Sequence, residues 1–223
     1  MINLGINIWS GQKTSGLGAI ITTNRAFWYR KATASGASWP DASGLARNLA
    51  LTGSPTIGAT SVTFSGTGQY GTAAFAFGAP CTIYIRVKQV SWTAGRSIFA
   101  GAATGSLRLE QQAGGASPLI YLNDSLGFGG GGVVAVSLPV GTFGNVGCMY
   151  SGGLTDALNL NGTDMVTNDA IGTGDTIASG FTLAANSSAG ASPSNIEVVE
   201  VIGYSAAHSL SERAQMMSYM STL

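Results

Sequence analysis

Apolar and polar residues alternate with a period of two through much of this chain. In the segment 81–89, CTIYIRVKQ, aliphatic side chains alternate with a tyrosine, an arginine and a lysine. Because successive side chains of a β-strand point to opposite faces, this pattern predicts a half-buried strand. Similar runs between turn residues predict strands at 61–64, 106–110, 119–122, 133–138, 145–150, 157–160, 163–166, 181–184 and 196–204. Many short strands at regular spacing are typical of an all-β sandwich or barrel.

Two local signals indicate how the second half of the chain turns and ends. Asn161-Gly162 stands between two apolar runs and predicts a tight hairpin, because both central residues of that turn need a positive φ. Ser209 and Glu212 form a Ser-x-x-Glu capping box, which predicts the start of a short C-terminal helix. The apolar residues at helical spacing, which we expect to cover one end of the sandwich, are Leu210, Ala214, Met217 and Met220.

The composition favours a single globular domain. Of the 223 residues, 33 are glycine, 45% are hydrophobic and only 9% are charged. The apolar content argues against a disordered chain, and a sandwich of this length is ordinary for one domain. We therefore expect an N-terminal arm or first strand at residues 1–35 and one sandwich domain at residues 36–223.

Charge is unevenly placed although the net charge is zero. Residues 1–47 carry five basic residues and Asp41 as the one acid, a net charge of +4, and the remainder carries −4. In the basic part, three consecutive aromatic residues lie between arginines. These residues form either an interface anchor or an edge of the core. Solvated charges without a partner are the alternative. The residues that we expect to attach the chain to a partner are Trp9, Arg25, Phe27, Trp28, Tyr29, Arg30 and Lys31.

Several classes of protein are disfavoured by the sequence. The first nine residues lack the basic start and unbroken apolar run of a secretion signal. No segment is apolar for long enough to span a membrane, and no basic stripe is long enough to indicate nucleic-acid binding. Cys81 and Cys148 fall on the apolar faces of predicted strands, so we expect buried free thiols, with a disulfide as the alternative.

The acidic residues do not form the pair of facing carboxylates that glycoside hydrolysis requires. Glu197 and Glu200 are three positions apart on one predicted strand, so we expect them on opposite faces and interpret Glu200 as a structural residue at the core edge. We expect His208, in the loop before the helix, to be solvated. A His/Cys metal cluster is excluded for want of ligands. Calcium needs only oxygen ligands, and its candidates, for which turn formation is the alternative role, are Asn123, Asp124, Asp156 and residues 164–169.

Carbohydrate binding is compatible with the polar and aromatic residues of the middle strands. Such sites stack an aromatic ring on the apolar face of a pyranose and bind its hydroxyls with amide or carboxylate groups. The candidate carbohydrate-binding residues are Trp92, Tyr121, Asn123 and Asp124. Simple packing is the alternative role for Trp92 and Tyr121.

Five motifs in a fixed order resemble the laminin G-like, concanavalin A-like lectin/glucanase jelly roll. They are the Asp-x-Ser-Gly segment within 39–49, the Phe-to-Tyr turn at 64–70, the strand 82–87, the Asn-Gly hairpin at 157–162 and the closing segment 200–212. The resemblance implies an all-β, antiparallel jelly-roll sandwich with one short C-terminal helix. Within that family, neutral Gly/Ser/Thr-rich members without a signal peptide resemble surface proteins of tailed bacteriophages.

These observations lead us to expect a non-enzymatic surface protein of a virion or phage-like particle, such as a head spike, a capsid decoration or a fibre module. The expected partners are other particle proteins, further copies of the chain and host surface polysaccharide, without nucleic acid or membrane insertion. The protein would be made in the bacterial cytoplasm without a signal peptide and would reside on the particle surface. A free-standing lectin is the alternative function, followed by a glycoside hydrolase with unusual acids.

Overall fold

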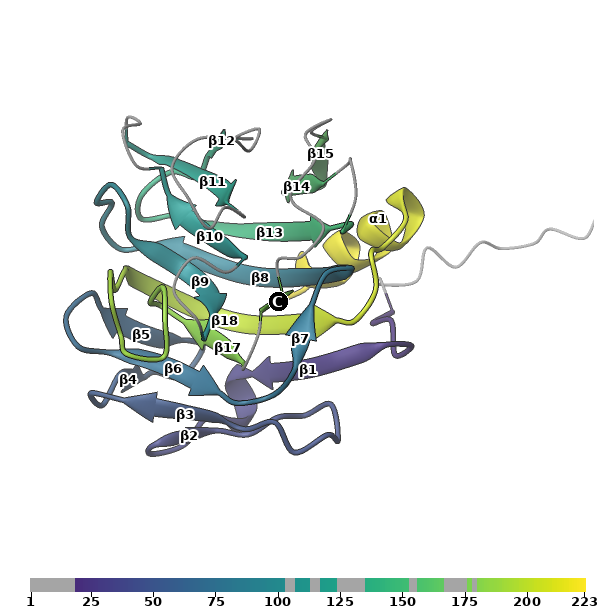
Figure 1. Cartoon of the computed structure of the whole chain (residues 1–223). Helices are drawn as coiled ribbons and strands as arrows, with labels where there is room; N and C mark the ends of the chain where they lie inside the picture. Colours follow the sequence, from purple (N-terminus) through teal and green to yellow (C-terminus); the bar gives the residue numbers. More distant parts are fainter. Residues whose placement is uncertain are drawn as a thin grey trace, which may run out of the picture.

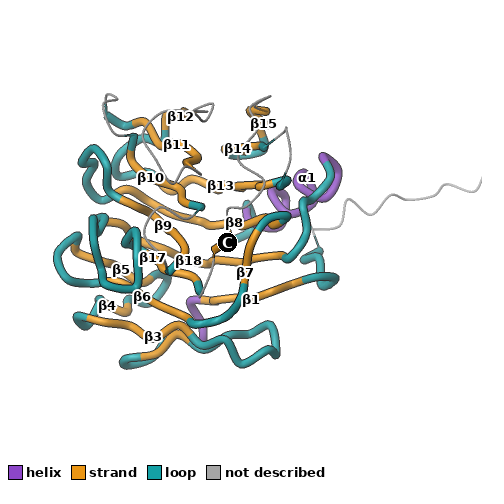
Figure 2. Tube along the Cα trace, viewed as in Figure 1, coloured by secondary structure: helices purple, strands orange, loops and turns teal. Residues whose placement is uncertain are grey.

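The computed structural model describes residues 19–102, 107–112, 117–123, 135–152, 156–166, 176–177 and 180–223. Two antiparallel β-sheets pack face to face, and one helix lies near the end of the chain (Figure 1). Strands and loops make up nearly all of the remaining trace (Figure 2). The predicted all-β, antiparallel jelly-roll sandwich with one short C-terminal helix is therefore confirmed.

The first sheet, here called sheet A, is built around two long central strands. Strand β18 pairs with β8 along one edge, while its other edge pairs first with β5 and then with β1 (Arg25–Arg30). The order of the main path is β15 (Thr163–Val166), β14 (Ala157–Leu160), β13 (Phe143–Tyr150), β8 (Cys81–Gln89), β18 (Asn195–Tyr204), β5 (Val62–Ser65) and β4 (Thr56–Ile57).

The second sheet, sheet B, also has antiparallel neighbours throughout its path. Its order is β12 (Ala135–Ser137), β11 (Leu119–Asn123), β10 (Arg108–Gln111), β9 (Ser97–Gly101), β17 (Phe181–Leu183), β6 (Tyr70–Ala73), β3 (Leu49–Thr52) and β2 (Ser38–Trp39). The short strands β7 (Phe77–Gly78) and β16 (Thr176–Ile177) form a separate pair, and the 3-10 turn η1 (Lys31–Thr33) follows β1. The main core therefore lies between two broad layers.

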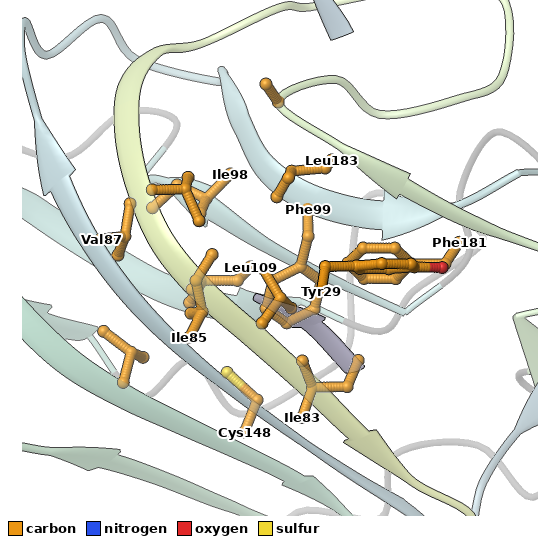
Figure 3. Close-up of a cluster of buried hydrophobic side chains, with 14 of the residues drawn as sticks. Tyr29, Ile83, Ile85, Val87, Ile98, Phe99, Leu109, Cys148, Phe181 and Leu183 are labelled. Atoms are coloured by element: carbon orange, nitrogen blue, oxygen red, sulfur yellow. The ribbon is translucent and has the colours of Figure 1, made fainter. Parts of the chain in front are cut away.

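Aliphatic and aromatic side chains from both sheets fill the space between the layers (Figure 3). Ile83, Ile85 and Val87 of β8 point inward and are fully buried, as the alternating pattern predicted. They meet Phe99 of β9 and Phe181 of β17 from the opposite sheet. Burial of each such side chain contributes roughly 1.5–3 kcal/mol to folding, so this shared core holds the two sheets together.

The helix α1 (Leu210–Met220) packs on the outer face of sheet A, the face turned away from sheet B. Met216, Met217 and Met220 cover Tyr84 and Tyr204. A Cβ atom on glycine 147 of β13 would lie only 2.6 Å from the Met217 methyl group, so glycine permits the close approach. None of the described helices has the length and apolar character of a membrane span.

The capping box that begins the helix is confirmed, but the predicted packing is partly wrong. The Ser209 hydroxyl accepts a hydrogen bond from the Glu212 amide, and the Glu212 carboxylate accepts one from the Ser209 amide. Leu210 is 66% exposed and Ala214 is also exposed. The helix thus covers the outer face of sheet A rather than an end of the sandwich, because its buried stripe is centred on the methionines.

Two further local predictions are confirmed. Asn161 and Gly162 join β14 to β15 with φ angles of 51° and 92°, which is the tight hairpin turn expected from their sequence. Cys81 and Cys148 are buried free thiols in the main core. Burial raises the pKa of both thiols, so they remain protonated and act as small apolar side chains.

Candidate functional site

Charged and aromatic residues meet on the outer face of sheet B, at β10 and β11. Strand register pairs Glu110 with Tyr121 and Arg108 with Asn123, while the intervening Leu109 and Leu122 point into the core. The Tyr121 hydroxyl donates to a Glu110 carboxylate oxygen, and the Arg108 Nε lies 2.7 Å from the other. We call Arg108, Glu110 and Tyr121 the Arg108 cluster. Glu110 and Tyr121 are only 5% and 7% exposed, so they fix the more exposed Arg108 in a preformed arrangement typical of ligand sites.

The four predicted sugar-binding residues do not all belong to this cluster. Tyr121 does, Asn123 ends β11 opposite Arg108, and Asp124 lies outside the described residues. Trp92, in the loop after β8, donates from Nε1 to the Leu119 carbonyl at 2.8 Å, at the other end of β11. Sequence reasoning missed Arg108 and Glu110, although the alternation in 106–110 places both on the face that points away from the core.

Buried glutamines fix the loop that carries Trp92. The Gln111 side-chain amide donates to Gln89 Oε1 at 2.7 Å and to the Ser91 carbonyl at 2.9 Å. The amide of Thr93 donates to Gln111 Oε1 at 3.0 Å. The half-buried Trp92 is therefore held in place before any ligand arrives, since a satisfied buried network rigidifies the segments that it joins.

The basic aromatic segment predicted to attach a partner is split between two faces of β1. Phe27 and Tyr29 are fully buried in the main core, so these two residues form an edge of the core and offer no attachment surface. Trp28 and Arg30 point to the outer face of sheet A, where Trp28 packs beside the helix. Lys31 begins η1, whereas Trp9 lies outside the described residues.

The outward part of β1 joins β18 and α1 in a second polar cluster. Trp28 Nε1 and the Tyr219 hydroxyl each donate to the same Glu200 oxygen at 2.7 Å, and Glu200 is only 3% exposed. Burial raises the pKa of the Glu200 carboxyl, although both hydrogen bonds and the nearby Arg30 oppose the shift. The guanidinium carbons of Arg25 and Arg30 each lie 4.7 Å from the Trp28 ring centroid. We call these five residues the Trp28 cluster.

The prediction that Glu197 and Glu200 occupy opposite faces is wrong. A β-bulge interrupts the register of β18 between Val198 and Glu200, so Glu197 pairs with Lys88 and Glu200 with Arg86, two residues apart on β8. The bulge adds one residue and returns both carboxylates to the outer face. Burial favours a raised pKa at Glu197, but hydrogen bonds from Lys88 and Ser61 lower it. The interpretation of Glu200 as a structural residue agrees with its burial.

His208 is buried, contrary to the expectation of a solvated side chain. It is 3% exposed, and its Nδ1 lies 3.0 Å from the Tyr84 hydroxyl oxygen. Burial lowers the pKa of the imidazole below its usual value. The neighbouring Arg213 donates to the His208 carbonyl at 2.7 Å and forms an ion pair with Asp164 at 2.6 Å. His208 therefore belongs to the contacts that fix the helix on sheet A.

Two of the candidate calcium ligands, Asp156 and Asp164, already have other partners. Asp156 accepts a hydrogen bond from the Ser151 amide at 2.6 Å, and Asp164 is paired with Arg213 and Asn159. Among the described residues, no three His, Cys, Asp or Glu side chains are grouped so as to hold a metal ion. Asp124 and residues 167–169 lie outside the described part.

The fold of this chain is similar to that of several solved structures, although no family model and no curated protein matches its sequence. Trypanosoma rangeli sialidase in complex with sialic acid matches with a TM-score of 0.68 and 14% identity, over 92% of this chain and 34% of that structure. Domain 4 of AbnA, a GH43 extracellular arabinanase from Geobacillus stearothermophilus, in complex with arabinotriose, matches with a TM-score of 0.62 and 14% identity, over 87% and 98%. The binding domain of botulinum neurotoxin DC in complex with SialylT matches with a TM-score of 0.68 and 11% identity, over 90% and 52%. These identities establish the shared sandwich fold alone.

Proposed function

We propose that this chain is a non-enzymatic carbohydrate-binding sandwich and that it serves on the surface of a phage-like particle. The observation that carries the binding proposal is the Arg108 cluster, in which Glu110 of the same strand and Tyr121 of β11 fix Arg108 on an outer face. Arg108 supplies hydrogen-bond donors for the hydroxyl groups of a sugar, and the buried Glu110 holds its guanidinium in orientation. Tyr121 holds Glu110 in position. The solved structures of similar fold that contain sialic acid, arabinotriose or SialylT support a search among glycans.

The rim formed by Trp92 offers a second contact for the same ligand. Val90 and Val140 are 41% and 43% exposed, and the Gln89 carbonyl joins their loops by accepting a hydrogen bond from the amide of glycine 141 at 2.8 Å. The half-buried ring of Trp92 and these two exposed valines offer apolar surface for the apolar side of a pyranose. We propose that many weak contacts of this kind, repeated over copies on a particle, provide avidity.

A glycan array with the full chain tests the carbohydrate proposal. We expect binding to at least one glycan, and Arg108→Gln should weaken that binding about ten-fold, because a charged hydrogen-bond donor is lost. Arg96→Gln is the matched control, since it removes the same charge from a residue outside the cluster. Trp92→Ala reports separately on the rim. Absence of binding to every glycan, or equal losses in the Arg108 and Arg96 variants, would contradict the proposed site.

Two further measurements test the remaining parts of the proposal. Incubation of the chain with acidic and neutral polysaccharides should release no new reducing ends, because Glu200 lies beneath Trp28 and Tyr219 and is closed to substrate. Antibodies against the chain should label the surface of purified particles. Glycan binding without particle labelling would replace the particle role with that of a free-standing lectin.

A further inference from the structure

The Trp28 cluster lies on the opposite outer face of the sandwich from the Arg108 cluster and has a different construction. Arg25 precedes and Arg30 follows Trp28 on β1, and both guanidinium carbons lie 4.7 Å from the centroid of its ring. Contact between a guanidinium and an indole orients the cation through the ring electrons. It leaves the N–H groups of the guanidinium free to donate hydrogen bonds.

These donors have no acceptors in the described part of the chain. Neither the Arg25 nor the Arg30 guanidinium has an ion-pair or hydrogen-bond partner there, and the Nε of Arg25 is buried as well. A buried polar group without a partner is rare and costly, and a bound ion or ligand often satisfies such a group. The Nε of Arg25 stays unsatisfied in the free chain, and the exposed guanidinium of Arg30 beside the same ring can reach an external acceptor.

The cluster is rigid before any such acceptor binds. The Trp28 ring is fixed by its hydrogen bond to Glu200, and Glu200 is fixed in turn by Tyr219 of the helix. A ring held at its edge presents the two stacked guanidinium groups in a defined orientation. Because less side-chain freedom remains to be lost, preorganisation of this kind favours binding.

The outer face of sheet A has an excess of positive charge at Arg25 and Arg30. The outer face of sheet A and the helix on it carry five basic residues against four acidic ones, a net charge of +1; they are Arg25, Arg30, Arg86, Lys88 and Arg213 against Asp164, Glu197, Glu200 and Glu212. Every side-chain carboxylate of the described residues already has a hydrogen-bond or ion-pair partner; these are Asp41, Glu110, Asp156, Asp164, Glu197, Glu200 and Glu212. The same surface on a second copy would offer like charge, so self-association through this face is disfavoured.

We propose that Arg25 and Arg30 bind the carboxylates of an acidic segment of a partner protein. Guanidinium groups match carboxylates through paired N–H donors, and arginine, tryptophan and tyrosine are the residue types enriched at the centres of protein interfaces. An acidic sugar fits less well, because the two arginines occupy the Trp28 ring on which a pyranose would stack. This site is independent of the carbohydrate site, which lies on the other sheet.

Binding of the full chain to poly-L-glutamate at low ionic strength tests the proposal. Arg30→Gln should weaken binding about ten-fold through the loss of charged hydrogen bonds, and the double variant R25Q/R30Q should weaken it further. Arg96→Gln, which removes one charge from a different part of the surface, should leave binding unchanged. Arg30→Lys keeps the charge but loses the paired donors, so its binding should fall between those of the wild type and Arg30→Gln. Urea unfolding of each variant verifies that the fold is retained.

Polygalacturonate, at an equal concentration of carboxylate groups, tests whether an acidic glycan binds the same arginines better than an acidic polypeptide does. We expect it to bind more weakly than poly-L-glutamate. Tighter binding of polygalacturonate through the same arginines would overturn the proposal in favour of an acidic glycan. Equal affinity of the wild type and the Arg30→Lys variant would reduce the site to unspecific charge and would also overturn it. Each result is separable from the glycan array, which depends on Arg108.

Discussion

The two outer faces of the sandwich each carry a tyrosine that donates a hydrogen bond to a glutamate, but the two pairs have different neighbours. On sheet B, Tyr121 and Glu110 are joined by Arg108, so the carboxylate charge is balanced inside the cluster. On sheet A, Tyr219 and Glu200 are joined by Trp28, and the nearby arginines contact its ring without an ion pair. The glutamate on sheet B is thus neutralised by an arginine of its own cluster. On sheet A, the arginines beside the glutamate remain without an ion-pair partner among the described residues.

This difference arises from what each sheet packs against. The outer face of sheet A lies under α1, which supplies Tyr219 and buries Glu200 at 3% exposure. The pair on sheet B comes from two neighbouring strands of one sheet. A carboxylate buried by a separate element depends on how firmly that element docks. Variants of the helix should therefore change the stability of the Glu200 pair more than that of the Glu110 pair.

Removal of a buried methionine from the helix should produce the largest effect. Met216 is fully buried against Tyr204, so Met216→Ala leaves a cavity and should lower the free energy of unfolding by about 2–5 kcal/mol. Leu210→Ala in the same helix is the matched control, because Leu210 is 66% exposed and should lose no more than about 0.5 kcal/mol. Urea denaturation measures both. Equal losses would show that helix docking contributes little to the stability of sheet A.

The local parts of this architecture were accessible from the sequence. The alternation in 81–89 predicted which side chains of β8 enter the core, and Asn161-Gly162 and the capping box at Ser209 predicted a turn and a helix start. Each of these signals acts between residues close in the chain. The bulge in β18 carries no such signal, and it reversed the predicted relation between Glu197 and Glu200.

Acidification should lower the free energy of unfolding, because His208 is buried where the helix packs on sheet A. The neutral imidazole is buried among Tyr84, Tyr204, Glu212 and Arg213, and burial lowers its pKa. The unfolded state then binds a proton more readily, so stability is complete above the ordinary pKa of about 6.5 and falls as the pH drops below it. The loss should be smaller than that from Met216→Ala.

The variant His208→Asn isolates this effect, because its side-chain amide can still meet Tyr84 but does not titrate. The difference in unfolding free energy between wild type and variant should change in favour of the variant as the pH falls from 7 to 5. A difference that stays constant across this range would remove His208 as the source of the acid sensitivity.

The candidate sites could be predicted only in part, because their members are distant in the sequence. Tyr121 was identified as an aromatic residue beside polar neighbours, but Glu110 and Arg108 became its partners only through the pairing of β10 with β11. Trp28 and Glu200 are 172 positions apart, and the pairing of β1 with β18 brings them together. The aromatic run of β1 gave no indication of which residues would enter the core, because that depends on the face that this strand turns toward sheet B.

The smallest expected effect comes from the charge of Glu200. Burial raises the folded-state pKa of this carboxyl, so the folded protein holds its proton more tightly than the unfolded chain does. The contribution to stability is then present below the ordinary pKa of about 4.3 and is lost as the pH rises through the folded value.

Glu200→Gln keeps an acceptor for Trp28 and Tyr219 but removes the titration. Its stability relative to the wild type should therefore rise between pH 4 and pH 7, as measured by urea denaturation. The corresponding variant on sheet B, Glu110→Gln, removes the carboxylate that pairs with Arg108, so it should lower the free energy of unfolding measured at pH 7. A stability difference between Glu200→Gln and the wild type that stays constant from pH 4 to pH 7 would show that burial does not raise the pKa of Glu200.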